Sequence, residues 1–123
     1  RYQFGPWSWP LVHAWARSLD FLDVIGITRI WERTCELTDR LKNGILETDR
    51  LDLFTPLKSE DSAALVSFGV GAISPEMVRD TLRERHNLVI KAIHATRKGM
   101  RASVPFFLLE EEVDFLIDKL REL

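Results

Sequence analysis

The sequence predicts an α+β fold in which helices cover one face of a small, mostly antiparallel, four-stranded sheet. Two segments with helical apolar spacing come first, four short strand-like runs follow with a helix between the pairs, and an amphipathic stretch closes the chain. The expected order is therefore αα-ββ-α-ββ-α, which buries these apolar stripes in the simplest way. We expect one domain over residues 1–123, with leading helices in 1–46 and the sheet-containing part in 47–123.

Two helices are expected in the leading part. Pro10 suits the first turn of a helix, and Gly26 can stop that helix with a left-handed backbone. A second helix is expected from a cap at Thr28 to Asn43-Gly44, a pair that favours a helix end. The positions that recur at helical spacing are Leu11, Trp15, Leu19 and Leu22, and then Ile30, Thr34, Leu37 and Leu41.

An antiparallel strand pair and a helix are expected next. Leu51–Pro56 and Leu65–Val70 flank the polar, turn-prone stretch KSEDS, a pattern typical of antiparallel strands. Ser74-Pro75-Glu76 then predicts a helix start, because Pro suits the first turn and an acid suits the positive end of the helix dipole. Asn87 can end this helix.

A second strand pair and a closing helix complete the predicted fold. Leu88–Ile93 and Met100–Val104 flank a basic turn at Thr96–Gly99. The last helix has an apolar stripe opposite an acidic face. The stripe consists of Val113, Leu116, Ile117, Leu120 and Leu123.

Composition excludes several classes of function. Seventeen basic and nineteen acidic residues are interspersed and give a net charge of −2, so we expect no nucleic-acid or membrane partner. The apolar runs are shorter than the roughly 20 residues that a membrane span needs. Cys35 is the only cysteine, and His13, His86 and His94 fall on different predicted elements, so no metal site is expected.

The last 25 residues, GMRASVPFFLLEEEVDFLIDKLREL, combine an Arg-x-Ser strand, a turn at Pro105 and an amphipathic helix. This arrangement resembles the C-terminal end of class V, fold-type I pyridoxal-phosphate (PLP) enzymes. That group includes cysteine desulfurases, selenocysteine lyases and isopenicillin N epimerase-like proteins. The segments that precede it in the family's order are RYQFG, SLDFLDVIGITRIWERTCELTDRL, LFTP, ALVSFGV and SPEMVRDTLRERHN.

The resemblance implies a longer parent enzyme. In such enzymes the lysine that holds PLP as a Schiff base lies in a large domain before this point. The chain is therefore expected to be the C-terminal small domain, without a catalytic residue of its own and not an enzyme alone. The implied parent is a homodimer that acts on a small amino acid by desulfuration, elimination, epimerisation or amino transfer. A cytoplasmic location is expected, because the sequence shows no apolar run long enough to span a membrane and no charged leader followed by an apolar segment. The implied partners are the missing N-terminal large domain and a second subunit.

Arg101 is the candidate substrate-binding residue. An arginine at the centre of a strand is costly to desolvate unless it is paired, and no acidic partner lies near it in sequence. In the family that the chain resembles, this arginine binds the α-carboxylate of the substrate through its planar fork. Without the resemblance, the favoured alternative is a solvated face of an edge strand, where Arg101 would pair with a surface acid.

Gly5 and Pro6 are the candidate cofactor-binding residues. The family tends to carry an Arg-aromatic-Glu-x-Gly-Thr run here, whose Gly-Thr pair binds the PLP phosphate across the dimer interface. This chain has RYQFGP, and Pro6 lacks both the hydroxyl and the N–H group that Thr would supply. The alternative is that Gly5-Pro6 is only a turn. A further departure is Phe107-Leu108-Leu109, in place of a Tyr-Asn-Thr run that caps the last helix.

Trp7, Trp9, Trp15 and Trp31 all fall in the first quarter of the chain. They could pack against the large domain or a second subunit, or they could form an internal aromatic cluster. Two other functions also stay open. One is a free-standing regulatory α+β domain in which Arg101 binds the carboxylate of an effector. The other is a protein-interaction module that uses the Trp-rich face.

Overall fold

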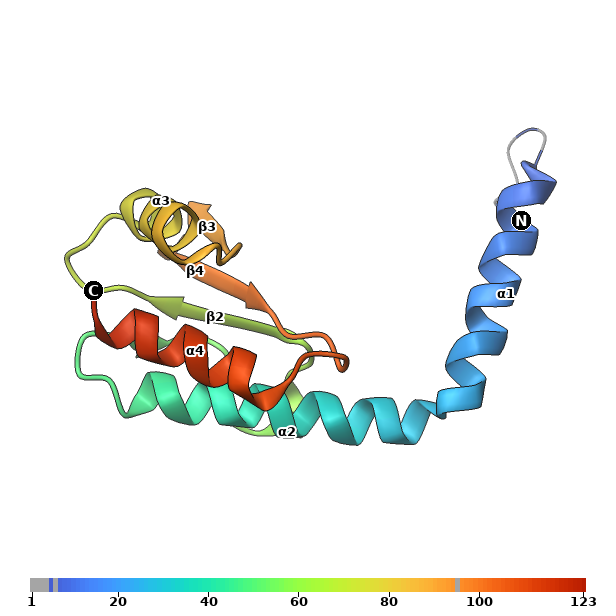
Figure 1. Ribbon diagram of the computed structural model, residues 1–123, viewed down its shortest axis with the longest axis horizontal. Coiled ribbons are helices and arrows are strands. Elements are labelled where there is room, and N and C mark those ends of the chain that lie inside the picture. Colours follow the sequence, from blue (N-terminus) through green and yellow to red (C-terminus); the bar gives the residue numbers. More distant parts are fainter. Residues whose placement is uncertain (1–4, 6, 95) are drawn as a thin grey trace. The chain divides into compact units, whose positions relative to one another are not determined.

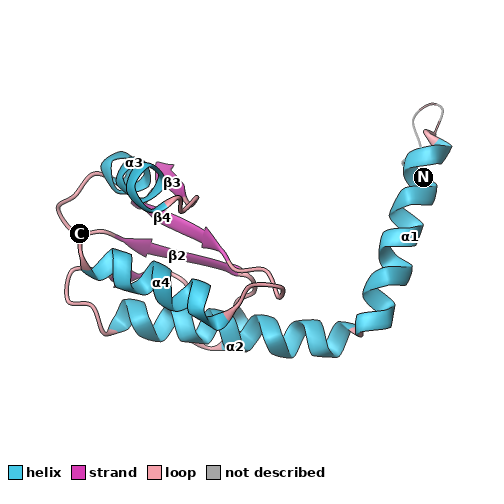
Figure 2. Ribbon diagram, in the orientation of Figure 1, coloured by secondary structure: helices cyan, strands magenta, loops and turns pink. Residues whose placement is uncertain are grey.

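The computed structural model describes residues 5, 7–94 and 96–123 (Figure 1). It consists of two compact units, Arg1–Trp31 and Glu32–Leu123, and each is described by itself. The single domain expected over residues 1–123 stays a prediction. Four helices and four strands follow in the predicted order, with one short 3₁₀ turn at Ser59–Asp61 (Figure 2). The predicted α+β class is therefore confirmed.

The first two helices begin and end differently from the prediction. Helix α1 spans Trp9–Ile25 and α2 spans Ile27–Leu46. Gly26 separates them as expected, with a φ of 95° and an N–H group that donates to Leu22 O over 2.9 Å. The predicted cap at Thr28 is wrong because α2 begins directly after Gly26.

The predicted end of α2 at Asn43-Gly44 is also wrong, because the helix continues to Leu46. Gly44 has a packing role instead. A Cβ atom at this position would lie 2.5 Å from Ile117 Cδ1 on the last helix, far inside van der Waals contact. The glycine lets the two helices approach closely and does not end a helix.

The sheet has the strand order β1-β2-β4-β3, and each neighbouring pair is antiparallel. The strands are shorter than or displaced from their predicted ranges. They span Asp52–Leu53 (β1), Leu65–Gly69 (β2), Lys91–His94 (β3) and Lys98–Ser103 (β4).

Local hydrogen bonds explain two of these differences. Strand β1 stops early because the N–H groups of Phe54 and Thr55 both donate to Ser67 O, over 2.9 and 3.2 Å, which breaks the regular ladder. Strand β3 starts late because the Leu88 N–H group donates to Leu82 O over 3.0 Å and closes the preceding helix.

The two remaining helices follow the prediction. Helix α3 spans Pro75–His86, and Asn87 ends it in the left-handed region with a φ of 59°. Helix α4 spans Glu110–Arg121. Its start has no capping residue in the usual position, but the Glu112 carboxylate accepts from the Leu109 N–H group over 2.8 Å.

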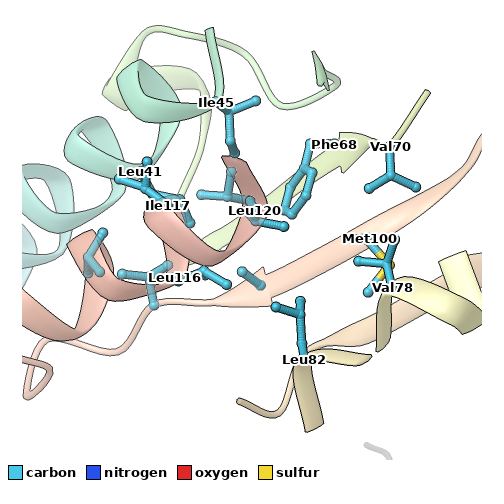
Figure 3. Packing of buried hydrophobic residues seen from close by; sticks show 14 of the residues in the cluster. Leu41, Ile45, Phe68, Val70, Val78, Leu82, Met100, Leu116, Ile117 and Leu120 are labelled. Atoms are coloured by element: carbon cyan, nitrogen blue, oxygen red, sulfur yellow. The ribbon is translucent and has the colours of Figure 1, made fainter. Parts of the chain in front are cut away.

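The core lies on one face of the sheet, as predicted. Alternate residues of the two central strands, Val66 and Phe68 on β2 and Met100 and Ala102 on β4, are buried there. Helices α2, α3 and α4 supply the other side of this core (Figure 3). The helix residues labelled in that view are Leu41, Ile45, Val78, Leu82, Leu116, Ile117 and Leu120. The opposite face of the sheet is left open by these helices.

Lys42 on α2 is completely buried, and its ammonium group binds the loop between β1 and β2. Its Nζ atom donates to Ser62 Oγ over 2.8 Å, to Leu57 O over 3.1 Å and to Asp39 Oδ1 over 3.2 Å. The three donors of the ammonium group are thereby used, which makes the burial of its charge tolerable. The loop is fixed to α2 by this contact.

Helix α1 buries none of its residues within the described chain. The four tryptophans are exposed, with fractions from 44% for Trp31 to 72% for Trp9. The Trp7 and Trp9 rings stack at 6.5 Å, and no other contact between tryptophan rings is found in the described part of the chain. None of the described helices is long and apolar enough to cross a membrane.

Candidate functional site

Arg101 lies on β4, on the open face of the sheet. Strand β4 is an interior strand, with β2 on one side and β3 on the other. Ser67 on β2 and Lys91 on β3 are the register partners of Arg101. Paired residues of antiparallel strands point to the same face, so these three side chains form a row across the sheet. The edge-strand alternative for Arg101 is therefore wrong.

The Arg101 side chain is half-buried, and its Nε atom is buried without a hydrogen-bond partner in the described structure. No described acidic residue forms a salt bridge with it. A buried donor without an acceptor costs roughly 1–3 kcal/mol, and the cost is greater for a charged group. The guanidinium is thus available to an acceptor from outside the described chain.

Phe54 packs against Gly99 on β4. A Cβ atom at Gly99, two residues before Arg101 on the same strand, would lie 2.9 Å from Phe54 Cε2 and 2.3 Å from Phe68 O. The absence of a side chain at Gly99 therefore makes room for the Phe54 ring. The Arg97 guanidinium lies over the Phe54 ring, 5.2 Å from its centroid.

The second predicted site is only partly within the described residues. Gly5 is exposed and has a φ of 87°, and nothing lies within 4 Å of the Cβ atom that another residue would have there. The positive φ is consistent with the turn alternative. Pro6 and residues 1–4 lie outside the described residues, so phosphate binding at Gly5-Pro6 stays a prediction.

Sequence reasoning missed Lys91 as the cross-strand neighbour of Arg101. The signal for Lys91 was the register of the hairpin, because counting outward from a short turn near Arg97 places a β3 residue opposite Arg101. In the described structure, no group of three His, Cys, Asp or Glu residues could hold a metal ion.

The sequence model described as "Aminotransferase class-V" matches residues 2–116, which is nearly the whole chain. The chain belongs to the class-V aminotransferase family. This confirms the family resemblance carried by the C-terminal segment and by the order of the segments before it.

Curated relatives of this class-V chain include two proteins described as probable cysteine desulfurases. The one from Streptomyces coelicolor is 29% identical over 112 residues, which cover 84% of this chain and 27% of the relative. The one from Synechocystis is 28% identical over 115 residues, which cover 85% of this chain and 27% of the relative. The class-V chain thus spans little more than a quarter of the length of these relatives.

Solved structures share the fold of this class-V chain. A NIFS-like protein superposes with a TM-score of 0.80 at 20% identity, over 97% of this chain and 34% of that one. The apo cysteine desulfurase from Thermococcus onnurineus gives a TM-score of 0.76 at 23% identity, over 84% of this chain and 28% of that one. At these identities the likeness concerns the fold.

Proposed function

We propose that this class-V chain is the small C-terminal domain of a PLP-dependent enzyme and that Arg101 binds the carboxylate of its amino-acid substrate. The buried, unpartnered Nε atom of Arg101 is the observation that carries this proposal. A carboxylate offers two acceptor oxygens in the plane of the guanidinium and would remove the cost of the unmet donor. Family membership and the relatives described as probable cysteine desulfurases support an amino-acid substrate.

The position of Arg101 suits a residue that orients a substrate. Strand β4 is hydrogen-bonded on both sides, and Met100 and Ala102 anchor it in the core. The arginine therefore stands on a rigid element, and its fork fixes the direction of a bound carboxylate as well as its place. Orientation of this kind determines which bonds of the substrate face the reacting group.

Three of the five lysines are engaged within this domain. Lys42 is buried with its three donors bound, and Lys58 and Lys119 form salt bridges with Glu60 and Glu122. The remaining lysines are exposed on the sheet. The family resemblance implies that the PLP-holding lysine lies in a large domain before this one, so we assign PLP to the parent protein, where it would supply the electron sink for chemistry at the α-carbon.

We propose that the large domain of the parent, or a second subunit, covers α1. All of the large apolar side chains of this helix are at least partly exposed, and Trp9, Leu11 and Trp15 are each more than 60% exposed, at 72%, 71% and 64%. Exposed apolar surface on this scale marks an interaction surface. We also propose that the parent protein is a cytoplasmic homodimer. Its proposed reaction is desulfuration, elimination, epimerisation or amino transfer.

The test is steady-state kinetics of the natural full-length protein with Arg101→Lys. Lysine keeps the charge but loses the two-point fork, so we expect kcat/KM for amino acids to fall about tenfold to a hundredfold, as for a loss of about 1.5–3 kcal/mol from a charged hydrogen bond. The matched control is Arg83→Lys, because Arg83 is exposed on α3. Unchanged kinetics for Arg101→Lys would refute the proposal. Equal use of amines that lack the carboxylate would refute it too.

A further inference from the structure

A second cation lies directly beside Arg101. Lys91 on β3 is the register partner of Arg101 on β4. The Cα atoms of such a pair are about 4.5–5.5 Å apart, and the two side chains leave the same face of the sheet. Like charges directly opposite each other on paired strands destabilise a sheet. The fold thus brings two cations together at an energetic cost.

The surroundings of the two cations do not neutralise them. Lys91 and Arg101 line one hollow of about 500 Å³ along the β3 edge of the sheet, together with Arg79, His94 and Ser103. No carboxylate lines this hollow. Neither Lys91 nor Arg101 forms a salt bridge with any residue in the described ranges 5, 7–94 and 96–123.

Two acidic residues contact the other cations of this hollow, His94 and Arg79, and neither forms a salt bridge with Lys91 or Arg101 in the described structure. Glu76 lies beside His94, with 3.2 Å between His94 Nδ1 and Glu76 Oε1. Asp80 is held by its neighbour Arg79, with 2.7 Å between Nε and Oδ1. The positive charge of Lys91 and Arg101 is therefore left for a ligand.

We propose that this hollow binds a substrate with two anionic groups, an amino acid that has an acidic side chain. The inference rests on the proposed function, since Arg101 would take the α-carboxylate while Lys91 takes the second carboxylate. The separation of paired strands is about 5 Å, which is comparable with the distance between the carboxylates of a four-carbon or five-carbon dicarboxylate. Arginine suits the group whose orientation matters, and the flexible lysine suits a side-chain carboxylate of variable position.

The test is a titration of the 123-residue chain with succinate, acetate and inorganic phosphate. Two-dimensional ¹H–¹⁵N NMR follows the Arg101 Nε–H signal and the Lys91 amide. We expect succinate to bind about threefold to fivefold more tightly than acetate, because a partly exposed ion pair adds up to about that factor. The preference should shrink when salt is added, since screening weakens exposed charge pairs.

Two variants isolate the contribution of Lys91. Lys91→Gln should remove the preference for succinate and weaken acetate binding by a smaller factor, because acetate loses only the nearby charge and succinate also loses a direct ion pair; Lys91→Arg should restore the preference. The matched control is Lys98→Gln, because Lys98 is an exposed lysine of the same hairpin that lines a different hollow. This control should keep the wild-type preference.

The outcomes separate this inference from the proposed function. If acetate and succinate both leave the Arg101 Nε–H signal unmoved, the carboxylate site itself is wrong. If acetate binds at Arg101 and succinate binds no more tightly, only the second subsite is refuted. If phosphate binds more tightly than succinate and depends on Lys91, the second cation serves a phosphate group and the acidic amino acid is refuted.

Discussion

Replacement of Arg101 by methionine should not destabilise the chain, and this distinguishes a ligand-binding arginine from a structural one. Methionine keeps an apolar stem of similar length but has no donor and no charge. The change removes a buried Nε donor that has no acceptor in the described structure, which is worth roughly 1–3 kcal/mol. It also removes the repulsion from Lys91, its cross-strand partner, which is worth a few tenths of a kcal/mol.

These gains are reduced by the part of the guanidinium that water solvates in the folded chain, since Arg101 is only half-buried. We therefore expect the free energy of unfolding of Arg101→Met to lie between the wild-type value and about 2 kcal/mol above it. The assay is urea unfolding followed by far-UV circular dichroism, with the slope against urea compared to confirm that the same surface unfolds.

The control for this experiment is Arg83→Met, an exposed change on α3 that should stay within about 0.5 kcal/mol of wild type. A loss of more than about 1 kcal/mol for Arg101→Met, at an unchanged slope, would refute the reasoning. Such a loss would mean that contacts within the chain hold the guanidinium, and the unmet donor would no longer point to a ligand.

Two further predictions concern the packing that supports the sheet, and both are measured by urea unfolding. Gly44→Ala should lower the free energy of unfolding by about 0.5–2 kcal/mol, because the new Cβ atom would lie 2.5 Å from Ile117 Cδ1 and this overpacking outweighs the usual gain for alanine in a helix. Asn43→Ala at the exposed neighbouring position should be neutral or slightly stabilising, and a stabilised Gly44→Ala would contradict the close approach of α2 and α4. Lys42→Ala should cost about 2–4 kcal/mol, because it leaves a cavity and unpaired partners in the buried loop contact. Lys58→Ala, on a side chain that is 75% exposed, should change little, and equal effects of the two lysine changes would contradict the buried role of Lys42.

Most of the fold could be predicted from the sequence because its signals are local. The stop at Gly26, the start at Ser74-Pro75 and the left-handed end at Asn87 each depend on the conformation of a few adjacent residues. Gly44 was misread because the reason for a glycine there is Ile117, which is 73 residues away in sequence. A helix-ending glycine and a helix-packing glycine look the same until the partner helix is placed.

The candidate site also has features that the sequence could predict and features that it could not. Arg101 could be found because it is a charged residue within a strand-like run, and because the family resemblance gave it a role. The unpaired state of its Nε atom could not be predicted, because that depends on every residue that the fold brings within reach. The partnership with Lys91 needed the register of β3 against β4, and the predicted strand boundaries were too imprecise to give that register.

Alternation along β4 links the site directly to the core. Met100 and Ala102 are buried against the helices, and Arg101 between them leaves the opposite face. Because the strand is pinned on both sides, a shift in the packing of Met100 must tilt the backbone that carries the guanidinium. A two-point contact to a carboxylate tolerates little change in angle, so core substitutions beneath β4 should weaken ligand orientation without touching the ligand. The precision of the site therefore depends on the helices of the opposite face.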